Sequence, residues 1–301
     1  MKKENNICVL TQTATDISDY YKDFFRGYDL YFVTFKKENS NAVDFLPNST
    51  WSDGRNRLWE EVRGKYNYYL FIDDDLIFNK AKHAKIALLQ RIRQKLDKGN
   101  LVNSYEKCSS NFFIGRLNHW LKYYKPEVLT VKNLNNLCAH SLDANALSHN
   151  QYVRRVGWFD AQFTLLSNYA AEHLLPYDTS FSGWASAQIL IYLLSYNVFG
   201  EKAISVTDIA VNNIFHTGAY VENYKSNLDC KQMIECLDKL GIESKTKLFD
   251  TKTNHVNLFY GKENILNKLI DKTLNVNYYE VFRTSSMFKL KEIMANNNLD
   301  F

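Results

Sequence analysis

Residues 68–75 have the sequence YYLFIDDD, in which five aromatic or aliphatic residues, Tyr68 to Ile72, lead directly into Asp73, Asp74 and Asp75. A short apolar run of this kind predicts a buried strand. The three aspartates then follow at the point where that strand leaves the sheet. Open parallel sheets bind ligands beyond the carboxyl ends of their strands, so this stretch indicates both a fold class and the place of a site.

The residues before this stretch predict alternating strands and helices. Residues 7–10 and 30–35 are apolar, strand-like runs, and between them residues 16–25 have the spacing of one helix face. A second helix is expected from an N-cap at Ser52 or Asp53 to the stop at Gly64. The order strand, helix, strand, helix, strand predicts an α/β fold.

The residues after it continue the mixed pattern. Helices are expected over about residues 80–96 and 185–196, mixed strand and helix over 159–175, and strands over 127–131, 142–147, 203–206 and 209–215. Beyond about Tyr220 the chain is rich in lysine and has helical spacing. We therefore expect an α/β domain over residues 1–220 and a mainly helical C-terminal extension over residues 221–301, packed on that domain.

Composition excludes several classes of protein. With 301 residues, 46% of them hydrophobic, the chain can bury a large core without disulfides. The five cysteines include no C-x-x-C pair, which favours free thiols in a reducing cytoplasm. The formal charge of +4 is too small for extensive phosphate contacts, so no nucleic-acid partner is expected. No apolar run approaches the roughly 18 residues of a membrane span, and the N-terminus lacks a signal-peptide core.

The three adjacent carboxylates indicate a divalent cation. Like charges at the end of a strand repel one another, and a metal ion would neutralise them. Mg²⁺ and Mn²⁺ take oxygen ligands and keep open positions for phosphate oxygens, so Asp73 and Asp75 are candidate ligands of a metal that bridges the protein to a diphosphate. The alternative is a solvated turn in which aspartate is a common cap.

Residues 51–60, WSDGRNRLWE, lie about twenty residues before Asp73, and together with residues 68–75 they resemble the GT-A family of nucleotide-sugar-dependent glycosyltransferases. In that family an Arg-Asn at a helix start precedes a hydrophobic strand that ends in a D-x-D motif. The resemblance implies a GT-A-like, Rossmann-type mixed sheet flanked by helices and an Mn²⁺ or Mg²⁺ cofactor. It implies nucleotide-sugar contacts from Thr11, Gln12, Thr13, Arg55, Asn56, Asp73 and Asp74. Arg55 would place a fixed positive charge near the nucleotide's anionic portion.

The same resemblance assigns a late histidine to the metal. His216 follows the expected strand 209–215, and several GT-A families bring a histidine to the D-x-D metal in this order. Imidazole is a softer ligand than carboxylate and suits manganese better than magnesium. A structural role for this lone histidine is the alternative.

Residues 175–188, LPYDTSFSGWASAQ, resemble the acceptor-side loop of GT-A enzymes, with Trp184 and Gln188 as acceptor-binding candidates. Ser186 and Ala187 stand where inverting members place a catalytic carboxylate. Asp178, or alternatively Asp160, would then act as the general base, unless the enzyme retains configuration and uses the leaving phosphate. Asp178 is equally compatible with a turn residue, and Trp184 with a core position.

The resemblance thus predicts a metal-dependent transfer of a sugar from a nucleotide-diphosphate donor, with a UDP-sugar favoured, to a hydroxyl of an oligosaccharide or lipid-linked glycan. The expected setting is bacterial surface polysaccharide synthesis, in the cytoplasm or at the inner face of the membrane. The lysine-rich tail favours a solvated surface over a weak peripheral membrane contact.

Two rival functions remain open. A nucleotidyltransferase of related fold would also place a metal on strand-end carboxylates, but residues 11–16, TQTATD, lack the glycine and lysine of its phosphate loop. A non-catalytic carbohydrate-binding or scaffold protein on the same fold is the second rival.

Overall fold

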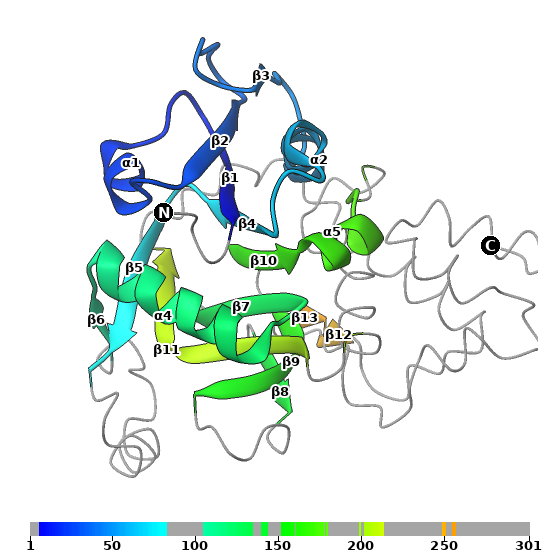
Figure 1. The fold of residues 1–301 in the computed structure, drawn as a ribbon. Coiled ribbons are helices and arrows are strands. Elements are labelled where there is room, and N and C mark those ends of the chain that lie inside the picture. Colours follow the sequence, from blue (N-terminus) through cyan, green and yellow to red (C-terminus); the bar gives the residue numbers. More distant parts are fainter. Residues whose placement is uncertain are drawn as a thin grey trace, which may run out of the picture.

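The computed structural model shows a mixed α/β fold with one large sheet flanked by helices (Figure 1). It describes residues 6–82, 105–134, 140–143, 152–159, 161–177, 179, 199, 202–213, 249–250 and 255–256. Within this part of the chain, eleven strands belong to the large sheet, and β12 (Phe249–Asp250) and β13 (His255–Val256) form a separate antiparallel pair. The prediction of an α/β protein is confirmed.

The strands of the large sheet are interspersed with helices along the chain. The first part comprises β1 (Ile7–Thr13), α1 (Asp19–Phe24), β2 (Asp29–Thr34), β3 (Asp44–Phe45), α2 (Trp51–Val62) and β4 (Tyr68–Asp73). The second part comprises β5 (Leu76–Ala81), β6 (Tyr105–Lys107), α4 (Ser110–Tyr124), β7 (Val128–Asn133), β8 (His140–Asp143), β9 (Val153–Phe159), β10 (Phe163–Ser167), α5 (Asn168–Leu174) and β11 (Ala203–Asn213). The strand order is β3-β2-β1-β4-β10-β7-β11-β5-β6, with β9 on β11 and β8 on β9.

The order in which the chain adds strands to the sheet reverses between β1 and β4, although the two strands are parallel. From β1 it passes to β2 and then β3 on one side, and it returns through α2 to β4 on the other side, all in parallel pairing. Figure 1 shows α1 and α2 on opposite sides of these strands. The carboxyl ends of strands beside such a reversal of strand order are the usual ligand position in open sheets. Gln12 of β1 lies opposite Asp73 of β4 at this edge.

Alternation along β4 determines which way Asp73 points. Leu70 and Ile72 belong to the core cluster that also contains Tyr21 of α1. Tyr69 faces the opposite side, where its ring centroid lies 4.8 Å from that of Trp59 in α2. Successive side chains of a strand point to opposite faces, so Asp73 shares the α2 face with Tyr69.

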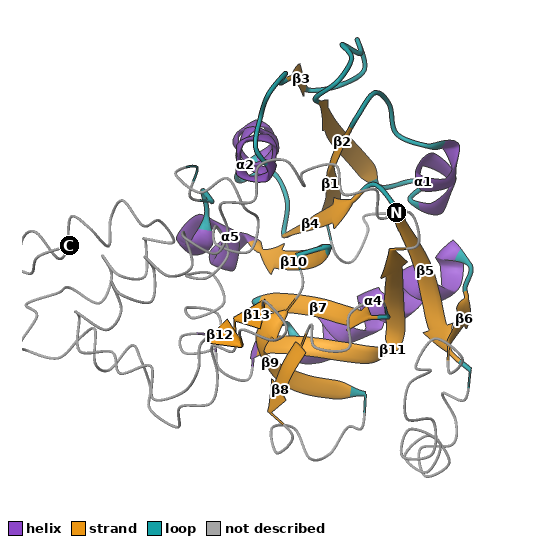
Figure 2. Cartoon of the chain, turned by 180° about the vertical axis from the view of Figure 1, so that it is seen from behind, coloured by secondary structure: helices purple, strands orange, loops and turns teal. Residues whose placement is uncertain are grey.

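The second half of the sheet is mixed. β10 is antiparallel to both β4 and β7, and β11 is parallel to β7 and antiparallel to β5 (Figure 2). The pairing of β11 with β7 shifts register between Val206 and Ala210. At that irregularity Asp208 is buried and accepts hydrogen bonds from Arg116 Nε, at 2.6 Å, and Trp120 Nε1, at 2.9 Å. This carboxylate fastens α4 to the bulge of β11.

Several expected elements are confirmed with adjusted ends. The strands expected at 7–10, 30–35, 68–72 and 127–131 are β1, β2, β4 and β7, and the helix expected over 16–25 is α1. The mixed region 159–175 contains β10 and α5, and β8 ends at Asp143 within the described residues. The expected helix 185–196 and the extension over 221–301 lie outside the described residues, apart from β12 and β13.

Two local predictions were wrong, and a third is tested only at its start. The helix expected over about residues 80–96 lies outside the described residues from residue 83 on, and Lys80 and Ala81 belong to strand β5, whose backbone is hydrogen-bonded to β11. The strands expected at 203–206 and 209–215 are a single strand, β11, described to Asn213. The N-cap of α2 is Thr50 rather than Ser52 or Asp53, since Thr50 and Asp53 form a reciprocal capping box.

The described cysteines are buried and free, as the sequence predicts. Burial raises the pKa of Cys8 above its usual range and that of Cys108 to about 12, so both remain protonated thiols. In the part of the chain that the structure describes, none of the helices has the length and apolar character needed to span a membrane.

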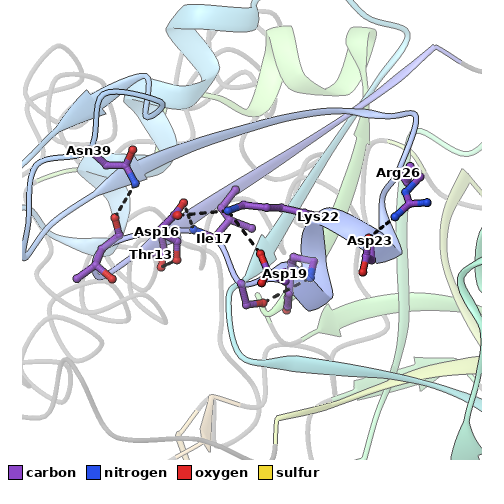
Figure 3. Close-up of polar contacts among 11 residues, drawn as sticks. Thr13, Asp16, Ile17, Asp19, Lys22, Asp23, Arg26 and Asn39 are labelled. Atoms are coloured by element: carbon purple, nitrogen blue, oxygen red, sulfur yellow. Dashed lines mark hydrogen bonds and ion pairs between the residues drawn. The ribbon is translucent and has the colours of Figure 1, made fainter.

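Replacement of Asp208 by alanine tests the link between α4 and β11. The change would leave the Trp120 N–H and the Arg116 guanidinium without their buried acceptor, and we expect the free energy of unfolding to fall by about 3 kcal/mol. Urea unfolding measures this loss. Asp23→Ala is the matched control, because Asp23 pairs with Arg26 on the exposed surface of α1 and should cost less than about 0.5 kcal/mol (Figure 3). Equal losses in the two variants would contradict the assignment.

Candidate functional site

The three consecutive aspartates at the end of β4 turn toward three different elements. Asp73 accepts a hydrogen bond from Arg55 Nη2 of α2, at 2.9 Å. Asp74 is hydrogen-bonded to Thr13 at the end of β1, and Asp75 to Asn213 at the end of β11. The DDD stretch therefore contacts α2 and the ends of β1 and β11.

The turn that carries these residues is closed by Tyr21. Its hydroxyl donates to the carbonyl oxygen of Asp73, at 2.7 Å, and accepts from the backbone N–H of Leu76, at 2.8 Å. Tyr21 itself is 2% exposed, so these hydrogen bonds are shielded from water. Burial, reinforced by the charges of the aspartates, raises its pKa well above the usual range, and the hydroxyl stays protonated. Tyr21 therefore fixes the backbone of the turn that carries the three carboxylates.

Asp75 is the most strongly perturbed carboxylate of the site. Burial, followed by the negative charges of Asp73 and Asp74, raises its pKa to about 6, and the hydrogen bond from Asn213 only partly opposes this. Its Oδ1 is buried and makes no hydrogen bond with the described residues. An unpartnered carboxylate oxygen beside two further carboxylates matches the ligand preference of Mg²⁺ and Mn²⁺. Asp75 therefore offers one oxygen ligand to a divalent cation.

The pKa of Asp74 is also raised. Desolvation and the charge of Asp73 raise its pKa, while the Thr13 hydrogen bond lowers it; because the residue is exposed to solvent, the effect of desolvation is limited. Among the residues that the structure describes, no group of three His, Cys, Asp or Glu side chains is close enough to hold a metal. Since Asp73 is directed to Arg55, a complete site requires a further ligand, and the candidate His216 lies outside the described residues.

Arg55 is buried next to Asp73. Its side chain is 3% exposed, whereas that of Asp73 is 32% exposed. The guanidinium carbon is 4.0 Å from the centre of the Trp51 ring, and Nη2 also donates to the carbonyl oxygen of Ala161 at 3.2 Å. This burial leaves almost no surface through which Arg55 could contact a nucleotide directly, and its polar contact at the site is Asp73.

Asn56 is also engaged inside the protein. Its Nδ2 donates to the carbonyl oxygen of Tyr177, at 2.8 Å, and its Oδ1 accepts from the Tyr177 N–H, at 2.7 Å. Both polar atoms of the amide are therefore used to hold the backbone of a residue 121 positions later in the chain.

The three expected contacts on β1 have different environments. The Thr11 hydroxyl is buried within the sheet without a hydrogen bond to the described residues. Gln12 is partly exposed and donates to the carbonyl oxygen of Thr50 at 3.4 Å. Its side chain lies so close over Gly54 that a Cβ there would come within 1.9 Å of Gln12 Nε2. Gln12 and Thr13 thus border the Asp73–Asp74 turn, while Thr11 lies in the sheet interior.

The loop after β1 is held by its own polar contacts (Figure 3). Thr13 donates to the carbonyl oxygen of Asp16 at 3.0 Å, and Asp16 accepts from the Ile17 N–H at 2.7 Å and from Lys22 Nζ at 3.2 Å. The hydrogen bond from Lys22 is the main cause that lowers the pKa of Asp16. Asn39, in the loop after β2, donates to the carbonyl oxygen of Thr15 at 3.0 Å. The two loops at this edge are therefore tied together.

The structure brings together one part of the expected site. Arg55, Asp73, Asp74, Asp75, Gln12 and Thr13 meet at the carboxyl ends of β1 and β4. Asp178, the alternative base Asp160, Trp184, Gln188 and His216 lie outside the described residues.

Sequence reasoning missed three contributors, Tyr21, Tyr177 and Asn213. Tyr21 lies in the helix expected over residues 16–25 and Asn213 in the strand expected over 209–215, and these patterns predict only packing for both. Tyr177 lies in the stretch 175–188, but nothing in that stretch predicts its contact with Asn56.

A scan of the sequence against models of known protein families gives no match, and a search among curated proteins gives none either. The functional argument therefore depends on the residues and the geometry of the site.

The Tyr21 hydroxyl is expected to stabilise the carboxylate turn. In Tyr21→Phe the Leu76 N–H loses its buried acceptor, and the free energy of unfolding in urea should fall by about 1–3 kcal/mol. Tyr123→Phe is the matched control, because Tyr123 is 71% exposed on α4 and should change the stability little. A Tyr21→Phe protein as stable as the control would show that the hydroxyl contributes nothing.

The raised pKa of Asp75 predicts a pH dependence of stability. Between the ordinary value of 3.8 and about 6, the folded state keeps the Asp75 proton that the unfolded state releases, so this group's contribution to stability falls as pH rises through that window. Asp75→Asn removes this dependence. With metal chelated, the variant should therefore gain stability relative to wild type between about pH 4 and about pH 7. Urea unfolding at the two pH values measures the difference, and parallel pH profiles of the two proteins would refute the assignment.

Proposed function

We propose that this chain is a metal-dependent glycosyltransferase of the GT-A type, which moves a sugar from a nucleotide-diphosphate donor to a glycan hydroxyl. The observation that carries the proposal is the Asp-x-Asp sequence at the carboxyl end of β4, beside the reversal between β1 and β4, with the Asp75 Oδ1 buried and unpartnered. A UDP-sugar is the favoured donor and an oligosaccharide or lipid-linked glycan the acceptor. The proposed setting is bacterial surface polysaccharide synthesis on the cytoplasmic side of the membrane.

In this proposal Asp73 and Asp75, with His216, would hold Mn²⁺ or Mg²⁺. The ion would supply positive charge to the departing diphosphate. Asp73 has one oxygen hydrogen-bonded to Arg55, so its other oxygen remains for the ion. Gln12 and Asp74 border the same turn and are the proposed contacts to the nucleotide, while Thr13, which is 3% exposed, would support them from the end of β1.

The acceptor side would be formed by residues after Tyr177. Trp184 and Gln188 are the proposed acceptor contacts, and Asp178 is the proposed base if the reaction inverts configuration. With retention, the leaving phosphate would accept the acceptor's proton instead. Determining the anomeric configuration of the product by NMR distinguishes the two outcomes.

The structure of the loop after β1 favours this proposal over a nucleotidyltransferase. A triphosphate loop presents backbone N–H groups and a lysine to the phosphates. Here Asp16 places a carboxylate in the loop and occupies both the Ile17 N–H and the nearby Lys22.

Calorimetry with UDP, with and without Mn²⁺, tests the proposed function. We expect UDP binding that requires Mn²⁺ in the wild type and is lost in Asp73→Asn and Asp75→Asn, since each removes a charged ligand. Asp23→Asn, on the exposed surface of α1, should bind like the wild type. Binding of UDP without metal would contradict the metal assignment. Absence of binding for UDP, GDP and CMP alike would favour a scaffold protein, and a panel of the corresponding sugar nucleotides, assayed for donor hydrolysis, identifies the donor.

A further inference from the structure

Arg55 and Asn56 are adjacent residues of α2 that hold two distant segments of the chain. Neighbouring residues of a helix point about 100° apart, so the two side chains contact different parts of the protein. Arg55 is directed to Asp73 at the end of β4, and Asn56 is directed to the backbone of Tyr177. One turn of one helix therefore fastens both the Asp-x-Asp strand end and the segment that leads into the proposed acceptor side.

The two attachments meet at the side chain of Tyr177. Its ring is buried against Trp51, with ring centroids 4.8 Å apart, and against Phe71, at 6.1 Å. Arg55 Nη1 and the Tyr177 hydroxyl are both buried, and neither makes a hydrogen bond of good geometry with a described residue. Burial raises the pKa of Tyr177, and the nearby positive charge of Arg55 only partly opposes this. Arg55 therefore lies between the Asp73 carboxylate and the Tyr177 hydroxyl.

Burial makes this arrangement responsive to the charge on Asp73. A guanidinium that is 3% exposed cannot exchange a lost carboxylate contact for water. If a cation binds Asp73 and weakens its ion pair with Arg55, Arg55 must rely more on the carbonyl oxygen of Ala161 and on the ring of Trp51, which also packs against Tyr177. A change in the ion pair between Asp73 and Arg55 would thereby alter the packing around Tyr177.

We propose that Arg55 and Asn56 are a positioning pair, which couples cation binding at Asp73 to the ordering of the Leu175–Tyr177 segment. The proposal depends on the proposed function, because it takes Asp73 as a metal ligand. Asn56 fixes the backbone of the segment, and Arg55 transmits the state of Asp73 to it. Binding of the ion then prepares the acceptor side, and by linkage an ordered acceptor side strengthens binding of the ion.

Hydrogen–deuterium exchange of a peptide that contains Leu175–Tyr177 tests this coupling. Pro176 has no amide hydrogen, so Leu175 and Tyr177 carry the signal of the segment. In the full-length protein without metal, Asn56→Ala should speed the exchange of the Tyr177 amide about tenfold, because both backbone hydrogen bonds are lost. Arg55→Met should speed it less, and Arg57→Met should leave it unchanged. Arg57 is the matched control, since it lies on the same helix and pairs with Asp44 and Glu61 instead.

Saturating Mn²⁺ provides the decisive comparison. We expect it to slow exchange of the Tyr177 amide at least about fivefold in the wild type and in Arg57→Met, and not in Arg55→Met. Binding of Mn²⁺, measured separately by calorimetry, without any change in Tyr177 exchange would overturn the coupling and leave the proposed function intact. Equal slowing in Arg55→Met would also overturn it, because the signal would then bypass Arg55. Failure of the wild type to bind Mn²⁺ would refute the proposed function and the coupling together.

Discussion

The buried ion pair between Arg55 and Asp73 is the interaction on which the arrangement of the site depends. A guanidinium taken out of water needs a nearby carboxylate and further acceptors, and here it has Asp73, the Ala161 carbonyl oxygen and the face of Trp51. These contacts join α2, β4 and the start of β10 at one point. Arg55 therefore fixes the position of the Asp-x-Asp stretch from inside the protein, without needing to contact a ligand itself.

The neighbouring aspartates show the opposite situation. Asp75 has a raised pKa and an oxygen without a hydrogen bond to the described residues, so it stabilises the fold poorly in its charged form. Local strain of this kind concentrates at functional sites, where a bound group relieves it. Within three consecutive residues, Asp73 is held in an ion pair with Arg55, whereas the Asp75 Oδ1 has no hydrogen-bond partner among the described residues.

The carboxylate turn itself is a product of packing from several elements. Tyr21 reaches across from α1 to close it, and Thr13 and Asn213 approach from β1 and β11. The loop after β1 is shaped by Asp16, Lys22 and Asn39 rather than by glycine. Rigid strand ends and hydrogen-bonded loops together give the site a defined geometry before any ligand arrives, which lowers the cost of ordering it.

The sequence by itself determined the strands of the parallel half, the first helix and the place of the aspartates, because these depend on apolar runs and on helix-face spacing within a few residues. It could not determine that Leu76–Ala81 is a strand, since that depends on pairing with β11 more than a hundred residues later. It placed Arg55 and Asn56 near the site, yet only the tertiary structure decided that both turn inward, to Asp73 and Tyr177. The directions of polar side chains depend on which distant donors and acceptors are buried beside them. Periodicity along the chain does not predict these long-range partners.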